Sequence, residues 1–400
     1  MKYYVESYGC TLNQGETEMF AESLEQQNTR VDSLKEADTA VIGTCVVIEK
    51  TEERMKRRIE YLAKQVDKVI ITGCLAETSK DDFDNMHKIK LIPPSKINFT
   101  ETCRPELIGI LPIASGCLGS CSYCITKLAR GYLKSWELEK IKRRFENLLN
   151  LGTKEIRLTC QDTASYGLDI NTTLPKLLER LLSIEGDYRI RIGMMNPDSA
   201  YPIIDDLIEK FKDERIYKFL HLPLQSGSDK ILNKMNRKYD IDTWKEVVNL
   251  FRNNLPHLTL STDIIVGFPG ESKQDFEMSK NVLKEIKPDI VNVTRFSARP
   301  GTSAFSMDDK IHSRIKKKRS KELTNLRFEI SKSINENYVN VETEAVILGE
   351  GKEDSLKGRL DDYKVIVIPE GDKNLIGKRV KVKIISAEEV YLVGEPLSDK

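Results

Sequence analysis

In the first third of its 400 residues the chain reads Cys117-Leu-Gly-Ser-Cys121-Ser-Tyr-Cys124, so that three cysteines follow the spacing CxxxCxxC. The apolar run Ile108-Gly-Ile-Leu-Pro-Ile113 comes just before them and predicts a strand that leads into this loop. Thiolates are the soft ligands of iron–sulfur clusters, and a 4Fe–4S cluster normally takes four of them. Three thiolates from one loop therefore leave one iron open to bind a small molecule.

Two other interpretations of this loop stay open: a zinc site without its fourth ligand, and three thiols that are close by chance. The nearest histidine is His87, well upstream, which argues against a local Cys₃His zinc site. The aromatic Tyr123 inside the loop and the strand before it favour the cluster.

The same spacing resembles the signature of radical S-adenosylmethionine (SAM) enzymes. The resemblance implies that Cys117, Cys121 and Cys124 hold the catalytic 4Fe–4S cluster. It also implies that the open iron binds SAM, and that an electron cleaves SAM to methionine and a 5′-deoxyadenosyl radical.

Length and composition indicate a globular protein of two or three domains, with 40% hydrophobic and 31% charged residues. The net charge of +1 gives no sign of a nucleic-acid partner, so any basic surface must be local. No stretch approaches the ~18 apolar residues of a membrane span, and the first residues lack a signal-peptide core. We therefore expect a cytoplasmic protein whose eight cysteines serve metal binding or catalysis instead of disulfides.

The first ninety residues alternate strands and helices, which predicts an open parallel sheet with its ligand crevice at the carboxyl ends of the strands. We expect strands at 2–8, 39–43 and 68–72 and helices at 13–27, 50–65 and 76–86. A cysteine follows each strand, namely Cys10, Cys45 and Cys74. Three thiols at equivalent positions should meet at one edge of the sheet and bind a second cluster; buried structural cysteines are the alternative.

The combined pattern resembles the methylthiotransferase family over essentially the whole chain. It consists of Tyr8-Gly-Cys-Thr-Leu-Asn-Gln14, Cys45, Gly73-Cys74 and the CxxxCxxC loop. The resemblance implies three domains. Pro93-Pro94 and the lack of periodicity after them predict a linker between the first two domains. We expect a three-cysteine domain at 1–92, the linker at 93–104, a radical SAM domain at 105–338 and an RNA-binding TRAM domain at 339–400.

Strands and helices alternate again after the loop, which fits a partial (β/α)₆ barrel with its site at the strand carboxyl ends. The expected strands are 108–115, 155–159, 189–193, 219–224, 261–267 and 289–296, and the expected helices are 135–151, 174–184, 201–212, 241–253 and 273–286. Polar residues follow several strands, and ordinary loop chemistry can explain them too. The predicted SAM contacts are Gln161, Gln225, Ser226 and Arg237, the last because a guanidinium suits a carboxylate.

Other residues near these loops have less specific interpretations. Asp162 and Arg299 can either contact the cofactor or form salt bridges inside the protein. Cys103 and Cys160 lie outside both triads, and a small apolar filler is the favoured role for Cys160.

The C-terminal part begins with the basic stretch His312–Lys321, which opens a helix that runs to about Asn337. This stretch either contacts phosphates or forms a solvated helix face. The last sixty residues contain five short alternating strands separated by glycines, which predicts a small β-barrel. The barrel stands where the resemblance places the TRAM domain.

The resemblance implies an enzyme that inserts sulfur at an unactivated C–H carbon and then methylates the sulfur. It would use two 4Fe–4S clusters and SAM. Leu158–Gly167 most resembles the archaeal and eukaryotic branch, which modifies N6-threonylcarbamoyladenosine beside the tRNA anticodon. The alternatives are the branch that modifies an aspartate of a ribosomal protein, and a non-catalytic iron–sulfur RNA-binding redox sensor. We expect a monomer whose partners are the tRNA anticodon stem-loop, an electron donor and a sulfur source, with no membrane partner.

Overall fold

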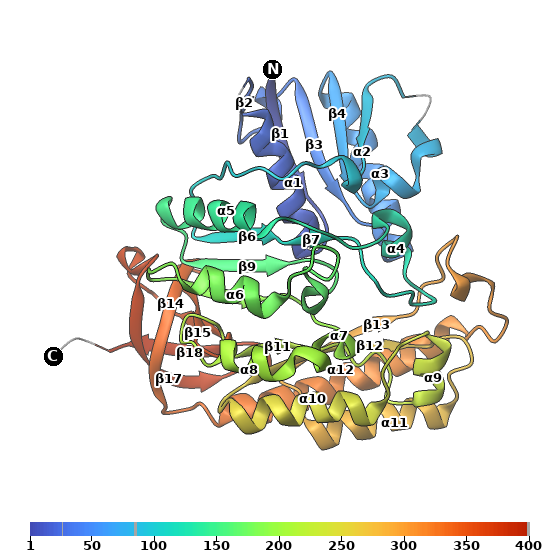
Figure 1. The fold of residues 1–400 in the computed structure, drawn as a ribbon, viewed down its shortest axis with the longest axis vertical. Coiled ribbons are helices and arrows are strands. Elements are labelled where there is room, and N and C mark those ends of the chain that lie inside the picture. Colours follow the sequence, from blue (N-terminus) through green and yellow to red (C-terminus); the bar gives the residue numbers. More distant parts are fainter. Residues whose placement is uncertain (26, 84–85, 398–400) are drawn as a thin grey trace.

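The computed structural model describes residues 1–25, 27–83 and 86–397 of the chain. Three parts follow one another in Figure 1: an N-terminal α/β sheet in blue, a central set of strands and helices, and a C-terminal β-barrel in red. This mixed α/β architecture confirms the predicted fold class. Within the described ranges, no helix combines the length and apolar character needed to cross a membrane.

The N-terminal sheet is parallel, with strand order β2-β1-β3-β4-β5. Its strands are β1 (Lys2–Ser7), β2 (Thr29–Arg30), β3 (Thr39–Thr44), β4 (Lys68–Gly73) and β5 (Ile89–Ile92), and its helices are α1 (Thr11–Leu24), α2 (Glu49–Gln65) and α3 (Leu75–Thr78). The three predicted strands are confirmed. The short edge strands β2 and β5 were not predicted, because two and four residues are too few to show a clear alternation.

One predicted helix of this sheet is wrong. The helix expected at 76–86 ends as α3 at Thr78, and a 3₁₀ turn at Lys80–Phe83 follows it. The turn has no apolar face, because Phe83 is its one buried side chain. Residues 84–85 of that expectation lie outside the described residues, as does residue 26 of the helix expected at 13–27.

Helix α1 is covered on both sides, by its own sheet and by the central part of the molecule. A Cβ added at Gly15 would lie 2.6 Å from Cγ2 of Ile110, so the glycine permits a close approach between α1 and strand β6 (Ile108–Pro112). Two glutamates of α1 are buried at this contact, Glu16 and Glu22. Each meets a buried arginine of the central part, Arg130 and Arg144 respectively.

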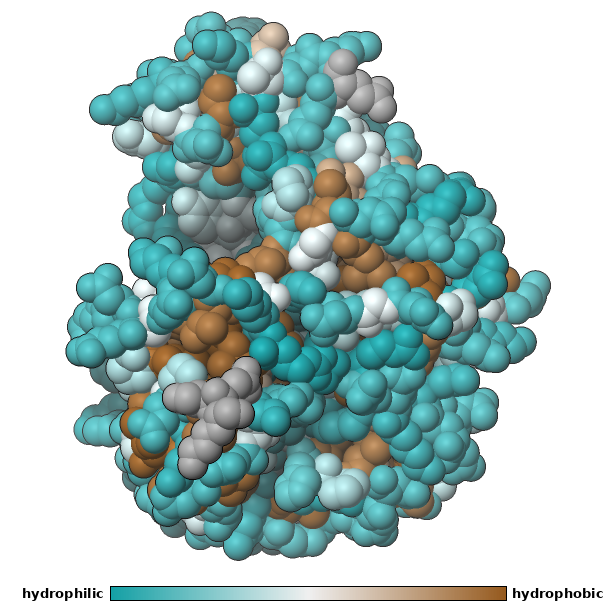
Figure 2. All heavy atoms as spheres, turned by 90° about the vertical axis from the view of Figure 1, so that its left-hand side faces the viewer, coloured by the Kyte–Doolittle hydropathy of each residue, from teal (hydrophilic) through white to brown (hydrophobic). Residues whose placement is uncertain are grey.

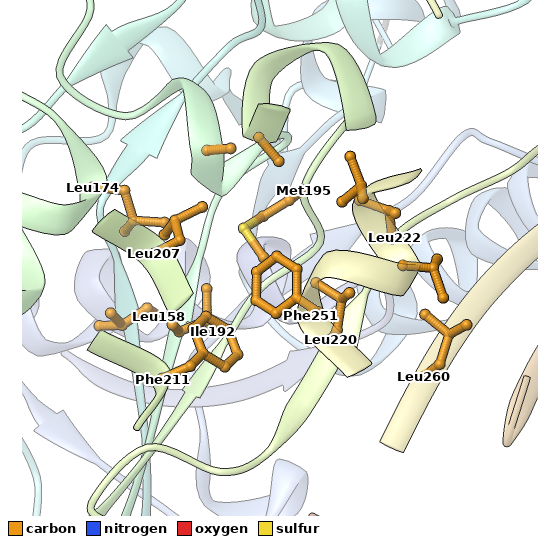
Figure 3. Close-up of a cluster of buried hydrophobic side chains, with 14 of the residues drawn as sticks. Leu158, Leu174, Ile192, Met195, Leu207, Phe211, Leu220, Leu222, Phe251 and Leu260 are labelled. Atoms are coloured by element: carbon orange, nitrogen blue, oxygen red, sulfur yellow. The ribbon is translucent and has the colours of Figure 1, made fainter. Parts of the chain in front are cut away.

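The central part is the predicted partial (β/α)₆ barrel. Its parallel strands are β6, β9 (Glu155–Thr159), β10 (Arg189–Ile192), β11 (Phe219–His221), β12 (Thr259–Val266) and β13 (Ile290–Arg295). They form two three-stranded sheets, joined by a bridge between Ile190 and Ile216. The outer helices include α5 (Leu138–Asn150), α6 (Leu174–Leu182), α8 (Ile204–Phe211), α10 (Ile241–Asn254) and α11 (Lys273–Ile286). Leucine, isoleucine and phenylalanine side chains fill the space between strands and helices (Figure 3).

The C-terminal barrel is closed, with strand order β14-β15-β16-β18-β17. The strands are β14 (Glu342–Glu350), β15 (Leu356–Leu360), β16 (Val365–Ile368), β17 (Arg379–Ala387) and β18 (Leu392–Pro396). Tyr363 packs its ring 4.9 Å from that of Tyr217 and 4.7 Å from that of Phe219. Because Phe219 begins strand β11, the C-terminal barrel covers the amino ends of the central strands. Figure 2 views the molecule from the side of this barrel and shows hydrophobic patches on a mostly hydrophilic face.

Helix α12 (Ser313–Glu336) starts at the opposite end of the central strands. Lys316 donates from Nζ to the backbone oxygen of Phe296, 3.0 Å away, just after β13 ends. Arg319 is buried and donates to the backbone oxygen of Glu271 at 3.0 Å. The basic stretch therefore begins beside the carboxyl ends of the central strands, where the site is expected.

Candidate active site

The three N-terminal cysteines follow neighbouring strands that end in register. Ser7 of β1 pairs with Gly43 of β3, and Thr44 of β3 pairs with Gly73 of β4. Cys45 and Cys74 come directly after these ends, and Cys10 comes three residues after Ser7. Burial is the main cause that raises the pKa of Cys74, and the neighbouring thiols of Cys10 and Cys45 add to the rise. The structure therefore brings together the three thiols that the sequence predicts to converge.

Tight backbone packing holds this edge in place. Asn13 is buried on α1 and donates from Nδ2 to the backbone oxygen of Thr44 at 2.5 Å. Gly73 has φ +83°, and a Cβ there would lie 2.4 Å from both Asn13 Nδ2 and Thr44 O. Only glycine fits this turn, because it accepts positive φ and has no Cβ.

The second triad lies in the loop between strand β7 (Ala114–Ser115) and helix α4 (Ile125–Arg130). The backbone N–H of Gly119 donates to Cys117 Sγ at 3.2 Å, and the N–H of Cys124 donates to Cys121 O at 3.1 Å. A Cβ on Gly119 would lie 3.3 Å from Cys117 Sγ and 3.9 Å from Cys121 Sγ. The loop thus wraps around a glycine that faces two of the sulfurs.

The residue types of both triads fit an iron–sulfur cluster, because thiolates are its usual ligands. Among the described residues, no three His, Cys, Asp or Glu side chains are grouped so that they could hold one metal ion. In a 4Fe–4S cluster the thiolates bind different irons, so they stand apart around the cluster. Burial raises the pKa of Cys74 and of Cys117 to about 11, and metal binding would deprotonate these thiols.

Arg237 connects the second triad to the rest of the site. Its Nη1 lies 3.0 Å from Cys121 Sγ, its Nη2 donates to Asn196 Oδ1 at 2.5 Å, and its Nε donates to Tyr239 OH at 3.1 Å. Asp162 in turn accepts from the backbone N–H and the Nδ2 of Asn196, both at 3.0 Å. A buried carboxylate therefore orients the amide that orients the guanidinium.

The other predicted SAM contacts lie at the same end of the barrel in different settings. Gln161 has a buried Oε1 with no hydrogen-bond partner among the described residues. Gln225 takes φ +69° and bonds to strand β12 through its backbone, and Ser226 is fully buried. A cavity of about 300 Å³ opens beside the loop and is lined in part by Gly119, Asp162 and Asn196.

The structure shows the surroundings of the residues for which the sequence left more than one role open. Arg299 forms an ion pair with Glu52 of α2, whereas Asp162 accepts hydrogen bonds from neutral groups. Cys160 packs in the apolar core. Cys103 lies next to the backbone oxygen of Glu101, 3.4 Å from its Sγ.

The sequence did not point to several residues of the site. Asn196 follows strand β10, and the search for polar residues after strands that found Gln161 could have found it. Inside the barrel, His221 Nε2 lies 3.0 Å from Asp263 Oδ2, and Asn292 donates to Asp263 Oδ1 at 2.8 Å. Nothing in the sequence marks Arg130, at the end of α4, as a neighbour of the first triad.

Sequence profiles of three families match successive parts of the chain. The uncharacterized protein family UPF0004 matches residues 2–92, the Radical SAM superfamily matches 111–283, and the TRAM domain matches 336–397. A probable threonylcarbamoyladenosine tRNA methylthiotransferase of Pyrococcus horikoshii is 39% identical over 99% of both chains. The chain belongs to the methylthiotransferase family of radical SAM enzymes.

Other members of the methylthiotransferase family match nearly as much of the chain. The threonylcarbamoyladenosine tRNA methylthiotransferase of Drosophila melanogaster is 32% identical and covers 100% of this chain and 78% of its own. A tRNA-2-methylthio-N(6)-dimethylallyladenosine synthase of Thermosipho africanus is 33% identical over 99% of both chains. As a methylthiotransferase the chain is a transferase, and its radical SAM domain implies a 4Fe–4S cluster and SAM.

A solved structure shows the same fold at low sequence identity. The radical SAM methyltransferase TsrM from Kitasatospora setae superposes with a TM-score of 0.57 and 12% identity, covering 76% of each chain. This similarity concerns the fold alone.

Proposed function

We propose that this enzyme converts N6-threonylcarbamoyladenosine next to the tRNA anticodon to its 2-methylthio derivative. The observation that carries the proposal is the 39% identity, over 99% of both chains, to a relative named for that activity. The relative named for dimethylallyladenosine is 33% identical over the same share. Modification of dimethylallyladenosine is therefore the second candidate.

In this proposal Cys117, Cys121 and Cys124 hold the cluster that works with SAM. When bound, the cluster supplies the electron for SAM cleavage. Arg237 binds the SAM carboxylate next to the loop, because a guanidinium offers a planar pair of donors to a carboxylate. Asn196 and Tyr239 hold the plane of that guanidinium. Gln161, Gln225 and Ser226 complete the SAM site at the ends of their strands.

A second 4Fe–4S cluster, held by Cys10, Cys45 and Cys74, is the proposed place where sulfur is carried or donated. The converging thiols and the glycine turn before Cys74 support this role. The proposed domains are 1–92, 105–338 and 339–400, of which 398–400 lie outside the described residues.

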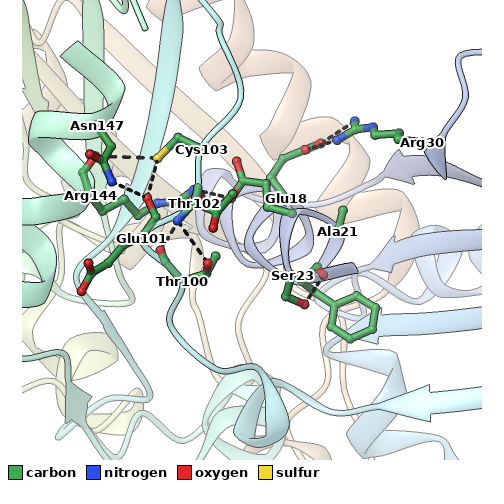
Figure 4. A network of polar contacts seen from close by, with 12 residues as sticks. Glu18, Ala21, Ser23, Arg30, Thr100, Glu101, Thr102, Cys103, Arg144 and Asn147 are labelled. Atoms are coloured by element: carbon green, nitrogen blue, oxygen red, sulfur yellow. Dashed lines mark hydrogen bonds and ion pairs between the residues drawn. The ribbon is translucent and has the colours of Figure 1, made fainter. Parts of the chain in front are cut away.

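The proposed linker, 93–104, is held firmly against the central part. Arg144 of α5 donates from Nη1 to the backbone oxygens of Thr100 and Thr102, at 2.9 and 2.5 Å (Figure 4). Asn147 donates to Glu101 O at 2.9 Å. These contacts fix the first domain relative to the second, so that a sulfur carried by the N-terminal cluster and a radical made at the other cluster could act on one nucleoside.

The proposed partner is the anticodon stem-loop of tRNA, and the enzyme would meet it in the cytoplasm. Single-stranded loops present unstacked bases and phosphates to a protein. The exposed side chains Arg314, Lys317, Lys318 and Lys321 of α12 lie near the site, and the C-terminal barrel lies at the far end of the strands. Both surfaces are candidate phosphate contacts.

The test of this function is mass spectrometry of tRNA nucleosides from a strain that lacks the gene. We expect the 2-methylthio derivative of threonylcarbamoyladenosine to disappear and the unthiolated nucleoside to accumulate. Loss of the 2-methylthio derivative of dimethylallyladenosine instead would select the second candidate.

A further inference from the structure

Arg130, the last residue of α4, is buried at the contact between the N-terminal sheet and the central barrel. Its side chain is 0% exposed, and that of Glu16 on α1 is 5% exposed. Nη1 of Arg130 donates to both carboxylate oxygens of Glu16 at 2.6 Å, and to Ser115 Oγ at 3.1 Å. Nη1 alone therefore makes all the hydrogen bonds between Arg130 and Glu16.

The other two nitrogens of Arg130 face no acceptor at hydrogen-bond distance among the described residues. Nε and Nη2 are buried and make no hydrogen bond to the described residues. The Nε atoms of four other arginines in the described chain are also buried without a hydrogen-bond partner, but only Arg130 also leaves a terminal nitrogen without one. An unsatisfied buried donor on a charged group costs free energy and calls for a ligand as its explanation.

The position of Arg130 indicates what that ligand is. Ala129, the residue before Arg130, packs in the same hydrophobic cluster as Cys74, and helix α4 contacts helix α3, which follows Cys74 directly. Burial raises the pKa of Cys74, and the positive charge of Arg130 opposes that rise. Helix α4 follows Cys124 directly, has six residues and is therefore about 9 Å long. It begins at the radical triad and ends beside the N-terminal triad.

We propose that Arg130 is a positioning residue for the second cluster: Nε and Nη2 donate to sulfur atoms of the cluster held by Cys10, Cys45 and Cys74, while Glu16 holds the guanidinium. The inference rests on the proposed second cluster. Hydrogen bonds to sulfur and a nearby positive charge stabilise the more negative, reduced cluster and raise its reduction potential. A residue of the radical SAM domain thus sets the potential of the N-terminal cluster.

Arg144 offers a matched control within the same interface. It pairs with Glu22 of α1 at 2.8 Å, with side chains 2% and 5% exposed. Its Nη1 is satisfied by the linker backbone, and no triad cysteine is among the groups that contact it. Replacing Arg144 therefore removes an equivalent ion pair between the same two parts, away from the triad.

The experiment uses the full chain with Cys117, Cys121 and Cys124 replaced by alanine, so that only the N-terminal cluster can form. Arg130→Gln, Arg130→Lys and Arg144→Gln are compared with this parent by iron and sulfide content and by a redox titration followed by EPR. We expect Arg130→Gln to lower the reduction potential. Arg130→Lys should lower it less, because lysine keeps the charge and loses the fork of donors. Arg144→Gln should leave the potential unchanged.

Three outcomes overturn the inference. An unchanged potential in iron-loaded Arg130→Gln refutes the contact and leaves the second cluster standing. Equal loss of iron from the Arg130 variants and from Arg144→Gln means that Arg130 only holds the domains together. A parent that binds no iron refutes the second cluster and the inference with it. Iron loss in both Arg130 variants, with full iron in Arg144→Gln, supports the contact even without a potential.

Discussion

Arg237 Nη1 lies 3.0 Å from Cys121 Sγ, which ties the guanidinium to a thiol of the radical loop. The loop and the guanidinium come from different parts of the barrel, because Arg237 follows helix α9 (Asp229–Lys234). Ser122 fixes the two parts together by donating from Oγ to the backbone oxygen of Lys234 at 2.8 Å. A carboxylate bound by Arg237 is thereby placed next to the cluster loop.

The first prediction concerns Arg237→Gln. Loss of hydrogen bonds to a charged group costs roughly 1.5–3 kcal/mol, so the dissociation constant of SAM should rise about 10- to 150-fold. Equilibrium dialysis of reconstituted protein measures it. Arg215→Gln is the control, because Arg215 pairs with Asp213 at the amino end of β11. Unchanged SAM binding in Arg237→Gln, with a full complement of iron, would contradict this role.

The second prediction is the iron content. Two triads should bind about eight iron atoms per chain, four in each cluster. Changing Cys10, Cys45 and Cys74 to alanine should leave about four, together with SAM cleavage to 5′-deoxyadenosine. Changing Cys117, Cys121 and Cys124 should abolish that cleavage. A wild-type chain that saturates at four iron atoms would refute the two-cluster claim.

The third prediction compares the two candidate phosphate-binding surfaces. Each lost single-strand phosphate contact lowers the log–log salt slope of binding by about 0.7. Changing Arg314, Lys317, Lys318 and Lys321 to glutamine should reduce the slope for tRNA by up to about 2.8 (four times 0.7). It should also slow the reaction, because α12 begins beside the site.

The matched variant replaces the exposed lysines of the C-terminal barrel, Lys357, Lys378 and Lys381. It should reduce the slope by up to about 2 (three times 0.7) and affect the reaction less. Filter binding over a range of salt concentrations gives both slopes. An unchanged slope in the α12 variant would show that this helix face is exposed to solvent and makes no contact with tRNA phosphates.

The fourth prediction concerns the attachment of the C-terminal barrel. Lys364 pairs with Asp289 at 2.7 Å, and both side chains are 7% exposed. Lys364→Met leaves the buried carboxylate of Asp289 without its charged partner and should destabilise the barrel by roughly 3–5 kcal/mol. Adding Asp289→Asn removes the charge and still accepts from the Leu260 N–H, so it should restore part of the loss. Hydrogen exchange of the barrel amides reports both effects; a double variant no more stable than Lys364→Met would contradict the account.

Much of the fold follows from short-range pattern. Alternating strands and helices predict the N-terminal parallel sheet and the parallel strands of the central barrel. The position of Cys10, Cys45 and Cys74 after successive strands predicts that they meet. These predictions work because parallel strands bring their carboxyl ends to one edge.

Other features depend on contacts between distant segments, which pattern does not record. From the sequence alone, the glutamates of α1 would be expected to face solvent. In the structure they are buried, because Arg130 and Arg144 of the central part pair with them. The C-terminal barrel is recognisable in sequence, but its place at the amino ends of the central strands depends on the packing of Tyr363. The helix expected at 76–86 fails because propensity alone does not provide an apolar face.

The most direct test of the proposed function uses reconstituted enzyme with reductant, SAM and a sulfur source. Two otherwise identical tRNAs are supplied, one with and one without the threonylcarbamoyl group, and a third carries dimethylallyladenosine. The product tRNAs are digested to nucleosides, and the masses of the nucleosides are measured by mass spectrometry. We predict a methylthio mass increase only on threonylcarbamoyladenosine. An increase only on the unmodified or the dimethylallyl nucleoside, or only on a ribosomal protein, would contradict the proposed substrate.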